Sequence, residues 1–561
     1  MKRLLTRISN HIAEHPVETM LSVICYILLL SIFMLSLNKI NLRMNHELAD
    51  IASCDANLFF TVGRGMLIGK RPYLDYYENK PPMIFLISAI SYAWTGDFHM
   101  VNVDSFLCCI NLLVLTFIIG PILGWKRKWK AFPTALATLL LGSCGILFML
   151  YAEFKAGEIM TELFGASAML DAIFCLLLIP KDKKVAFYDP RVILSGFFFG
   201  IAVMFKEPFA FMGVFSFLFI IEKKEDLLNK FIFPGVYGVL TAIIILLVTN
   251  SFVGYFQVYI PNMFGHHIEI YGSVWDRMGN VNKLFDNLAS FHWSLRVVVV
   301  ACFAVSSFRG VTMQFSENFY VDLPLRLLRA LLPLTYLYVA SFCVGLGGQY
   351  WWHHYAFAMP FYYGLLIDSA ILIGDTSSLM SPLSFQTEEE KKKSYSSFLH
   401  PLVLAGIAVS VSFSLISGYG VRKYEWTDKE DKMISFIVDA KAAANYVDEV
   451  LDALNEEEYL YVGFNGDSRL YCYTKHMPMG PSFVQDPNNF YSNDTFFAKA
   501  FVEEMEATNL VVVQAWTQGV LINWTKQYLK ENFTTTLPAQ ANGIQKPSSF
   551  SYVLYSRKGV F

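Results

Sequence analysis

Charged residues are concentrated between two apolar stretches near the start of this chain. The segment from residue 50 to residue 82 holds Asp50, Asp55, Arg64, Asp75, Glu78 and Lys80. Unpaired charge beside membrane-grade sequence is costly and usually functional. The segment therefore predicts chemistry at a membrane surface.

Asp55 is the predicted general base. A carboxylate near the end of an apolar span can take a proton from an acceptor hydroxyl, provided that it lies beside the reacting centre in a water-poor pocket. The alternative is that Asp55 is a solvated loop acid or a helix cap, with no catalytic role.

Three cations are candidate ligands for a phosphate leaving group: Lys80, Arg64 and Lys206. Such a group gains negative charge in the transition state, and a fixed cation stabilises that charge. Arg64 and Lys206 are equally well explained as residues that extend their charges to the membrane interface.

A second acidic element lies in the sequence AGEIMTELFGASAML. Glu158 and Glu162 are spaced i, i+4, so they share one helix face. Two like charges there would destabilise a membrane helix unless a cation, a metal or a substrate group lies nearby. The alternative is a helix cap followed by a solvated turn.

Four of the eleven histidines form two adjacent pairs. His354 and Tyr355 belong to the aromatic sequence GGQYWWHHYAFAMP, whose tryptophans are also explained as interface anchors. His266 and His267 precede Glu269, but adjacent histidines in an extended segment point apart. We therefore predict no metal ligands and no cofactor, and leave open a divalent cation.

The charged segment also contains the pattern G-x-x-P-Y-x-D-x-x-x-x-K-P-P, formed by Gly69, Pro72, Tyr73, Asp75, Lys80, Pro81 and Pro82. It resembles the lipid-linked-sugar glycosyltransferases of the GT-C class, in particular the protein mannosyltransferase and aminoarabinose transferase-like group (glycosyltransferase family 39-like). In that group an acidic residue after the first membrane helix precedes a tyrosine and acid pair, then a lysine with prolines.

The resemblance implies a role for each matched residue. Asp55 matches the catalytic acid position, Lys80 becomes the strongest phosphate ligand, and Glu162 matches loosely a G-x-x-T-E-type acid. His354 and Tyr355 match an H-Y pair before a span. The remaining pocket residues would be Tyr73, Asp75, Glu78, Glu158 and Lys206. The chain departs from the group's pattern because Asp55 has Asp50 five residues earlier in place of an adjacent acidic partner.

The composition is that of a membrane protein. Of 561 residues, 55% are hydrophobic and 16% aromatic, and the net charge is -3. This excludes an ordinary soluble domain, and without a basic patch the chain has no predicted nucleic-acid partner.

About eleven spans are expected from apolar runs of about 20 residues. The run from 192 to 221 is divided at FKEP, because its two flanks are both rich in lysine or arginine and so belong on the cytoplasmic side. The N-terminus is then cytoplasmic and the end of the chain extracytoplasmic, in a bacterial inner or plasma membrane. Residues 83 to 94 are too short to span and are expected to form an interfacial or re-entrant helix.

The predicted fold class is mostly α, with two domains. Residues 1–419 would form a GT-C-type membrane domain, whose outer loop 38–102 carries juxtamembrane helices. Residues 420–561 would form a small extracytoplasmic α/β domain, with helices near 431–454 and 523–532 and strands near 459–464, 509–515 and 551–557.

The predicted function is that of an inverting membrane glycosyltransferase. As the resemblance implies, it would move a sugar from a polyprenyl-phosphate carrier to a lipid, glycan or protein acceptor on the extracytoplasmic face of the bilayer. The alternatives are a transporter or flippase, which usually has related halves and charges near the bilayer midplane, and an inactive scaffold or receptor.

Overall fold

The computed structural model describes residues 16–47, 54–151, 160–179, 185–267, 280–291, 293–346, 350, 352–379, 428–463, 469–483, 485, 489–514, 520–548, 550 and 552–561. Several features predicted from the sequence lie outside these residues: Glu158, Asp50, the apolar run at 401–418, which is one of the expected spans, and the domain boundary near residue 420. Helices make up most of the described chain, as the sequence predicts.

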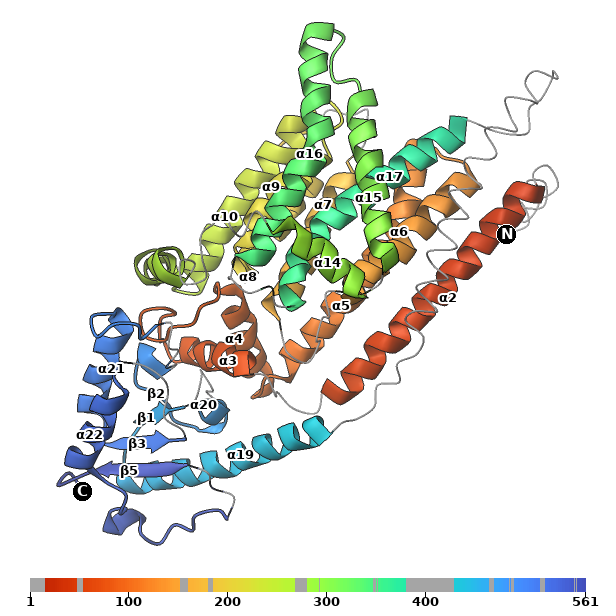
Figure 1. The fold of residues 1–561 in the computed structure, drawn as a ribbon. Coiled ribbons are helices and arrows are strands. Elements are labelled where there is room, and N and C mark those ends of the chain that lie inside the picture. Colours follow the sequence, from red (N-terminus) through yellow and green to blue (C-terminus); the bar gives the residue numbers. More distant parts are fainter. Residues whose placement is uncertain are drawn as a thin grey trace, which may run out of the picture.

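A bundle of long helices forms the larger part of the molecule (Figure 1). Its members are α2 (Pro16–Glu47), α5 (His99–Arg127), α6 (Ala131–Tyr151), α7 (Thr161–Leu177), α8 (Pro190–Phe205), α9 (Pro208–Phe219), α10 (Phe233–Val248), α15 (Trp293–Thr312), α16 (Phe319–Gly345) and α17 (Met359–Leu379). The chain breaks between α8 and α9 at Lys206 and Glu207, as predicted. Pro208 begins α9, where its missing N–H has no intrahelical partner to lose.

Shorter helices connect these elements. They are α3 (Cys54–Leu67), α4 (Met83–Thr95), η2 (Leu228–Ile232), α11 (Phe252–Gly254), η3 (Tyr255–Tyr259), α12 (Ile260–Asn262), η4 (Met263–His267), α14 (Val281–Phe291) and η6 (Trp352–Ala358). The charged segment, expected as a loop, thus begins with the helix α3. The expected short helix at 83–94 is α4.

Four helical segments of the described chain are long and apolar enough to cross a membrane: His99–Arg127, Leu228–Val248, Phe319–Gly345 and His353–Asp375. Shorter apolar helices include Ala131–Gly145, Pro190–Phe205 and Pro208–Phe219. The apolar helices are those of an integral membrane protein, while the expected number of about eleven spans stays a prediction.

One end of the bundle is held together by buried charges. Asp368 of α17 accepts hydrogen bonds from Arg309 of α15 and Arg329 of α16. Arg309 also pairs with Glu222, which in turn pairs with Arg127 at the end of α5. Residues of α5, α15, α16 and α17 and of the segment after α9 therefore meet in one network, in which each of these three arginines has a carboxylate partner.

The described residues from 428 to 561 form a second, smaller unit, called here the C-terminal unit. Its sheet is mixed, in the order β2-β1-β3-β5-β4. Its elements are α19 (Asp428–Leu454), β1 (Glu458–Val462), α20 (Arg469–Tyr473), β2 (Met477–Pro478), η7 (Pro481–Phe483), α21 (Phe496–Ala507), β3 (Leu510–Val513), α22 (Ile522–Asn532), β4 (Phe533–Thr534), η8 (Ala539–Ala541) and β5 (Val553–Arg557). The small α/β unit expected from the sequence is confirmed. Four of its elements were not predicted, namely α20, α21, β2 and β4.

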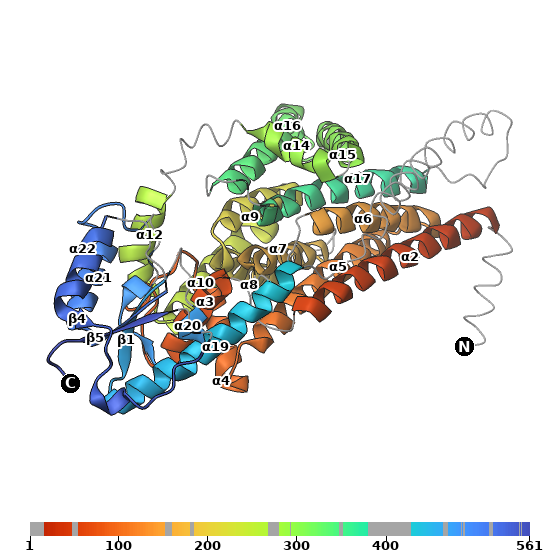
Figure 2. The same cartoon turned by 60° about the horizontal axis from the view of Figure 1, so that its bottom comes forward.

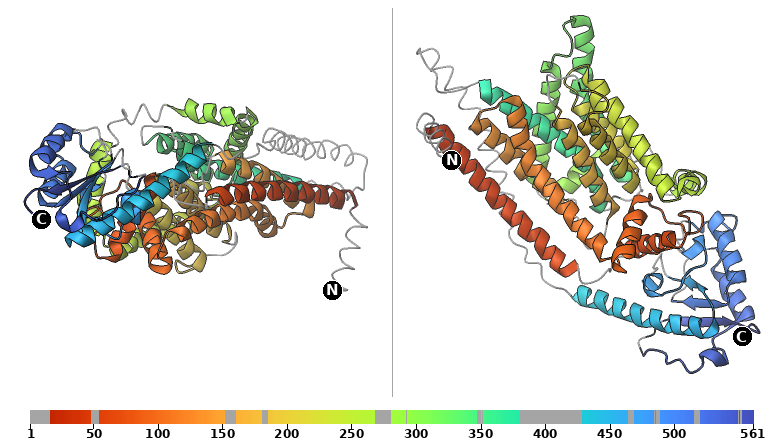
Figure 3. Two further views of the ribbon diagram at one scale, coloured as in Figure 1. Left: turned by 90° about the horizontal axis from the view of Figure 1, so that it is seen from below. Right: turned by 180° about the vertical axis from the view of Figure 1, so that it is seen from behind.

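The C-terminal unit lies at the end of the bundle where α3 and α4 are found (Figures 1 and 2). Seen from behind, α3 and α4 lie between the sheet and the long helices (Figure 3, right). Hydrogen bonds join the two parts: the Tyr76 hydroxyl donates to the carbonyl of Pro478 at 2.6 Å, and Lys70 pairs with Glu458 at 2.9 Å. Apolar side chains of α3 and of the sheet share one core. The sheet therefore supports the segment that carries Asp55 and Lys80.

Candidate functional site

Acidic and basic side chains from four places in the chain converge at this end of the bundle. Asp55 lies in the first turn of α3, Lys80 precedes α4, Glu162 lies in the first turn of α7, and Lys206 follows α8. Burial opposes the charge of Lys80, yet its pKa is raised above the usual value because four carboxylates act on it: Asp55, Glu78, Glu162 and Glu207. Lys80 is thus a permanent cation among acids.

Lys80 is held from two directions. Its Nζ lies 3.7 Å from Oε1 of Glu78, whose side chain is 6% exposed. The Tyr73 hydroxyl donates a 2.8 Å hydrogen bond to the backbone carbonyl of Lys80. Tyr73 is fully buried and has a φ of 70°, a backbone region that costs a non-glycine residue energy. The surrounding core therefore fixes Tyr73, and Tyr73 fixes Lys80.

Lys206 is the second cation of the group, and it is half-buried. Its Nζ lies 3.8 Å from Oε1 of Glu162, and its side chain is 14% exposed. Burial and the charge of Lys80 lower the pKa of Lys206, while nearby acids partly offset them. Lys206 is thus held inside the protein against Glu162, and does not extend to a membrane surface.

The two carboxylates predicted for chemistry have different surroundings. Asp55 is partly exposed, and the start of α3 favours its negative charge. Glu162 is 1% exposed and accepts a 3.1 Å hydrogen bond from the Thr161 hydroxyl, so it is not the solvated turn of the alternative interpretation. For Asp55, a base and a first-turn helix acid both remain compatible with this position.

The predicted aromatic element also reaches this group. His354 and Tyr355 lie in η6, and Tyr355 is buried. His353 of the same turn lies close to Glu162 and His354. His353 is not among the residues predicted from the sequence, although its neighbour His354 is.

Two further residues of the site were missed. Glu207 accepts a hydrogen bond from the hydroxyl of the buried Tyr259. The sequence signal for Glu207 was its position beside Lys206 in the break at FKEP. Tyr259 gave no signal, because it comes from η3, far along the chain.

Two predicted residues lie elsewhere. The Arg64 guanidinium donates to the backbone carbonyls of Tyr471 and Thr474, each at 2.8 Å, and to that of Lys475 at 3.2 Å. Asp75 pairs with Arg71 at 2.8 Å, and this hydrogen-bonded pairing lowers the pKa of Asp75. These contacts hold both residues away from the group around Lys80. The structure therefore does not support phosphate binding by Arg64.

A separate cavity lies at the opposite end of the bundle. It is lined by residues of the charged network, among them Lys126, Arg127, Glu222, Arg309 and Asp368, and by Leu177. Leu177 ends α7 and Glu162 lies in its first turn, so about 22 Å of helix separates the cavity from the candidate site. The cavity therefore belongs to the helix network.

Comparisons with known proteins give structural likeness only. No protein-family model and no curated protein sequence matches the chain. The chain is similar to ArnT from Cupriavidus metallidurans, solved bound to undecaprenyl phosphate, with 12% identity, 95% of this chain and 97% of that chain covered, and a TM-score of 0.49. It is also similar to the archaeal oligosaccharyltransferase AglB from Archaeoglobus fulgidus, solved in complex with an inhibitory peptide and a dolichol-phosphate, with 10% identity, 93% and 74% covered, and a TM-score of 0.40.

Both proteins are sugar transferases of the GT-C class, the class that the motif before α4 resembles. With TM-scores below 0.5, the likeness is one of overall arrangement. It carries neither a substrate nor a catalytic residue over to this chain.

Proposed function

We propose that this protein is an inverting membrane glycosyltransferase. It takes a sugar from a polyprenyl-phosphate carrier and passes it to a hydroxyl of a lipid, glycan or protein acceptor on the extracytoplasmic face. The observation that carries the proposal is the pair of half-buried lysines, Lys80 and Lys206, near the partly exposed carboxylate of Asp55, whose charge acts on both. The group combines cations for a phosphate with a base for an acceptor.

The proposed reaction is a single displacement. Asp55 takes the proton of the acceptor hydroxyl while that oxygen attacks the anomeric carbon of the sugar. The bond between this carbon and the phosphate oxygen breaks, and the polyprenyl phosphate leaves with the bonding electrons. Attack from the side opposite the leaving group inverts the anomeric carbon.

Lys80 and Lys206 stabilise the charge that grows on the leaving phosphate. Glu78 and Glu162 hold the two ammonium groups before substrate arrives, so little reorganisation is needed. Tyr73 acts through Lys80 and is a positioning residue. His354 and Tyr355 line the same region from η6. Arg64 and Asp75 receive no part in the reaction.

The decisive experiment measures transfer of radiolabel from polyprenyl-phosphate sugars to a cell-envelope extract by the purified full chain. Asp55→Asn keeps the shape of the side chain and removes the base, so transfer should fall by about 10²- to 10⁴-fold. The matched control is Asp97→Asn, because the Asp97 side chain is 46% exposed and contacts Thr95 and His99, which lie outside the site. Transfer by Asp55→Asn at the wild-type rate would exclude Asp55 as the base.

A second comparison tests the lysines. Lys80→Gln and Lys206→Gln should each lower transfer by about 10²- to 10³-fold, as expected for the loss of a preorganised charge in the transition state. Lys475→Gln is the control, since the Lys475 side chain is 69% exposed in the C-terminal unit. A transporter or flippase would instead move lipid-linked substrate across vesicles without forming a new glycosidic bond, which the same labelled donor detects.

A further inference from the structure

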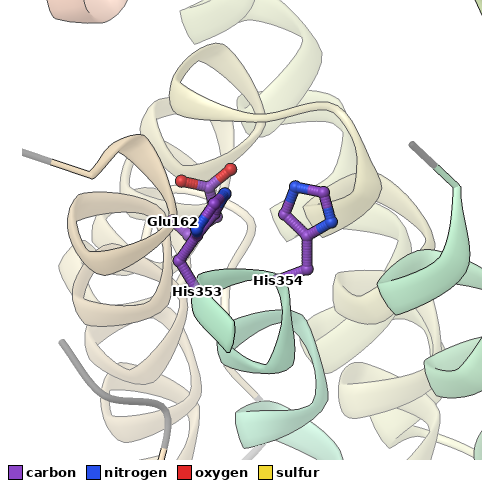
Figure 4. Close-up of side chains that lie close together, drawn as sticks. All are labelled: Glu162, His353 and His354. Atoms are coloured by element: carbon purple, nitrogen blue, oxygen red, sulfur yellow. The ribbon is translucent and has the colours of Figure 1, made fainter. Parts of the chain in front are cut away.

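Three side chains with metal-binding atoms lie together where η6 approaches the start of α7. Glu162 comes from the first turn of α7, and His353 and His354 come from η6 (Figure 4). One ligand atom from each residue lies within 4.8 Å of the others. No metal ligands are predicted here from the sequence, in which His354 is expected only as a residue of the substrate pocket.

The backbone of η6 explains why these neighbours can share a site. The segment is a 3-10 helix, with about three residues per turn, so successive side chains are rotated by about 120° rather than placed on opposite faces. The imidazole rings of His353 and His354 are 4.6 Å apart between centroids, with an interplanar angle of 86°. Both rings can therefore offer a nitrogen to one ion placed between them and Glu162.

The donor set and its spacing select the kind of metal. Two imidazoles and one carboxylate are the ligands of His₂Glu zinc sites, which leave a fourth position open. Around such an ion, ligand atoms about 2.1 Å from the metal lie about 3.4 Å from one another. The present separation of up to 4.8 Å would close through small side-chain rotations. Imidazole ligands also favour transition metals over magnesium.

The surroundings of Glu162 orient its carboxylate. Its Oε2 accepts the 3.1 Å hydrogen bond of the Thr161 hydroxyl, and Oε1 lies 3.8 Å from Lys206, which is beyond hydrogen-bond distance. Oε1, which has two lone pairs, can therefore accept a metal ion while its ion pair with Lys206 is kept. Outer-shell hydrogen bonds of the Thr161 kind commonly fix metal-binding carboxylates.

The charge of the whole group also calls for a cation. Four carboxylates, those of Asp55, Glu78, Glu162 and Glu207, act on Lys80, and Lys206 is the second cation of the group. Two negative charges are left over when the histidines are neutral, as metal ligands must be. One divalent ion would balance them, and a group so balanced would repel a phosphate less.

We propose that Glu162, His353 and His354 bind one divalent transition-metal ion of the zinc class, with one coordination position open. The site lies inside the proposed active site, but metal binding is separable from the reaction. Binding can hold while sugar transfer fails, and the two proposals are therefore tested by different measurements.

The test uses the purified full chain after treatment with a chelator. Zn²⁺ binding is measured by competition with a chromogenic chelator, and Co²⁺ is added separately to report the coordination geometry by its visible absorption. We expect one equivalent of Zn²⁺, and a Co²⁺ spectrum typical of a four-coordinate site with nitrogen and oxygen ligands. His353→Gln, His354→Gln and Glu162→Gln should each weaken Zn²⁺ binding at least tenfold.

The matched control is the double variant His266→Gln/His267→Gln, which removes the other adjacent pair, at the end of η4. It should bind Zn²⁺ like the wild type. Loss of binding in this control alone, or wild-type affinity in the His353 and His354 variants, would overturn the proposal. The absence of both Zn²⁺ binding and a Co²⁺ spectrum in the wild-type chain would do the same, whether or not the variants fold.

Discussion

The Tyr73 hydroxyl donates a 2.8 Å hydrogen bond to the backbone carbonyl of Lys80. This bond crosses the turn before α4 and places the ammonium group of Lys80 beside Glu78. The tyrosine ring packs within the core, 4.9 Å from the ring of Tyr259 between centroids. Tyr259 in turn donates to Glu207, the residue next to Lys206. One buried aromatic contact thus links the loop of the first lysine with the break that carries the second.

Removing the Tyr73 hydroxyl tests this link. Tyr73→Phe keeps the ring in the core and loses one hydrogen bond, a net cost of about 1 kcal/mol. We expect sugar transfer to fall about fivefold, with the unfolding temperature nearly unchanged. Tyr491→Phe is the control, because Tyr491 is 52% exposed in the C-terminal unit. An equal fall in both variants would show that the loss is not specific to the position of Lys80.

Parts of this fold follow from local sequence. Pro208 and the charges before it divide one apolar run into α8 and α9, and residues 83 to 94 form α4 as expected. Apolar and polar patterns also place β1, β3 and β5 near their observed positions. These features depend on proline geometry, hydrophobic periodicity and local secondary-structure propensity, all of which can be determined from the sequence alone.

The contacts that assemble the site could not be predicted in the same way. Arg64 has the charge and the sequence position expected of a phosphate ligand. Its hydrogen-bond partners are instead backbone carbonyls that lie more than 400 residues further along the chain. His353 is a candidate metal ligand only because η6 is a 3-10 helix and because Glu162, on another helix, lies close to it. Only tertiary packing decides which of several similar charges meet, and a single sequence does not contain that information.

Arg64 is predicted to fasten the C-terminal unit to α3. Its guanidinium supplies hydrogen bonds to several carbonyls around α20, and hydrogen bonds from a charged donor contribute about 1.5–3 kcal/mol each. Arg64→Met should leave these carbonyls without their partner and increase hydrogen exchange in α20 and β2. Exchange in α5 and α7 should stay as in the wild type.

Arg71→Met is the matched variant for this measurement. Arg71 lies in the same segment, but its side chain is half exposed and pairs only with Asp75. Its loss should change exchange in the C-terminal unit very little. Equal protection of α20 in Arg64→Met and in the wild type would mean that the shared apolar core, and not Arg64, holds the two parts together.

Asp368 is predicted to stabilise the other end of the bundle. Its carboxylate is 2% exposed and accepts hydrogen bonds from Ser306, Arg309 and Arg329. Asp368→Asn leaves two buried guanidinium groups short of a counter-charge, which costs about 3–5 kcal/mol. The variant should unfold at a clearly lower temperature in detergent, whereas Asp286→Asn, with a 73% exposed side chain, should not. If Asp368→Asn and the wild type unfold at similar temperatures, Glu222 alone supplies the counter-charge that the network needs.

Glu504 of α21 is predicted to make stability depend on pH. Burial raises its pKa to about 7; hydrogen bonds from Ser482 partly oppose this shift, and the charges of Glu458 and Glu503 add to it. The folded protein therefore keeps this proton at pH values where the unfolded chain, with a pKa near 4.5, has lost it. Proton binding by Glu504 therefore contributes to the free energy of unfolding. This contribution is fully present below pH 4.5, and up to about 3 kcal/mol of it is lost as the pH rises through about 7.

The measurement compares thermal unfolding of the wild type and of Glu504→Gln between pH 5 and pH 8. Glutamine carries no titrating proton, so the stability difference between the two proteins should shift in favour of the variant as pH rises. Glu531→Gln, a change on the adjacent helix α22, serves as control and should shift little, because Glu531 is exposed. A difference between wild type and Glu504→Gln that stays constant over this range would mean that Glu504 remains ionised in the folded unit, stabilised by the two hydrogen bonds of Ser482.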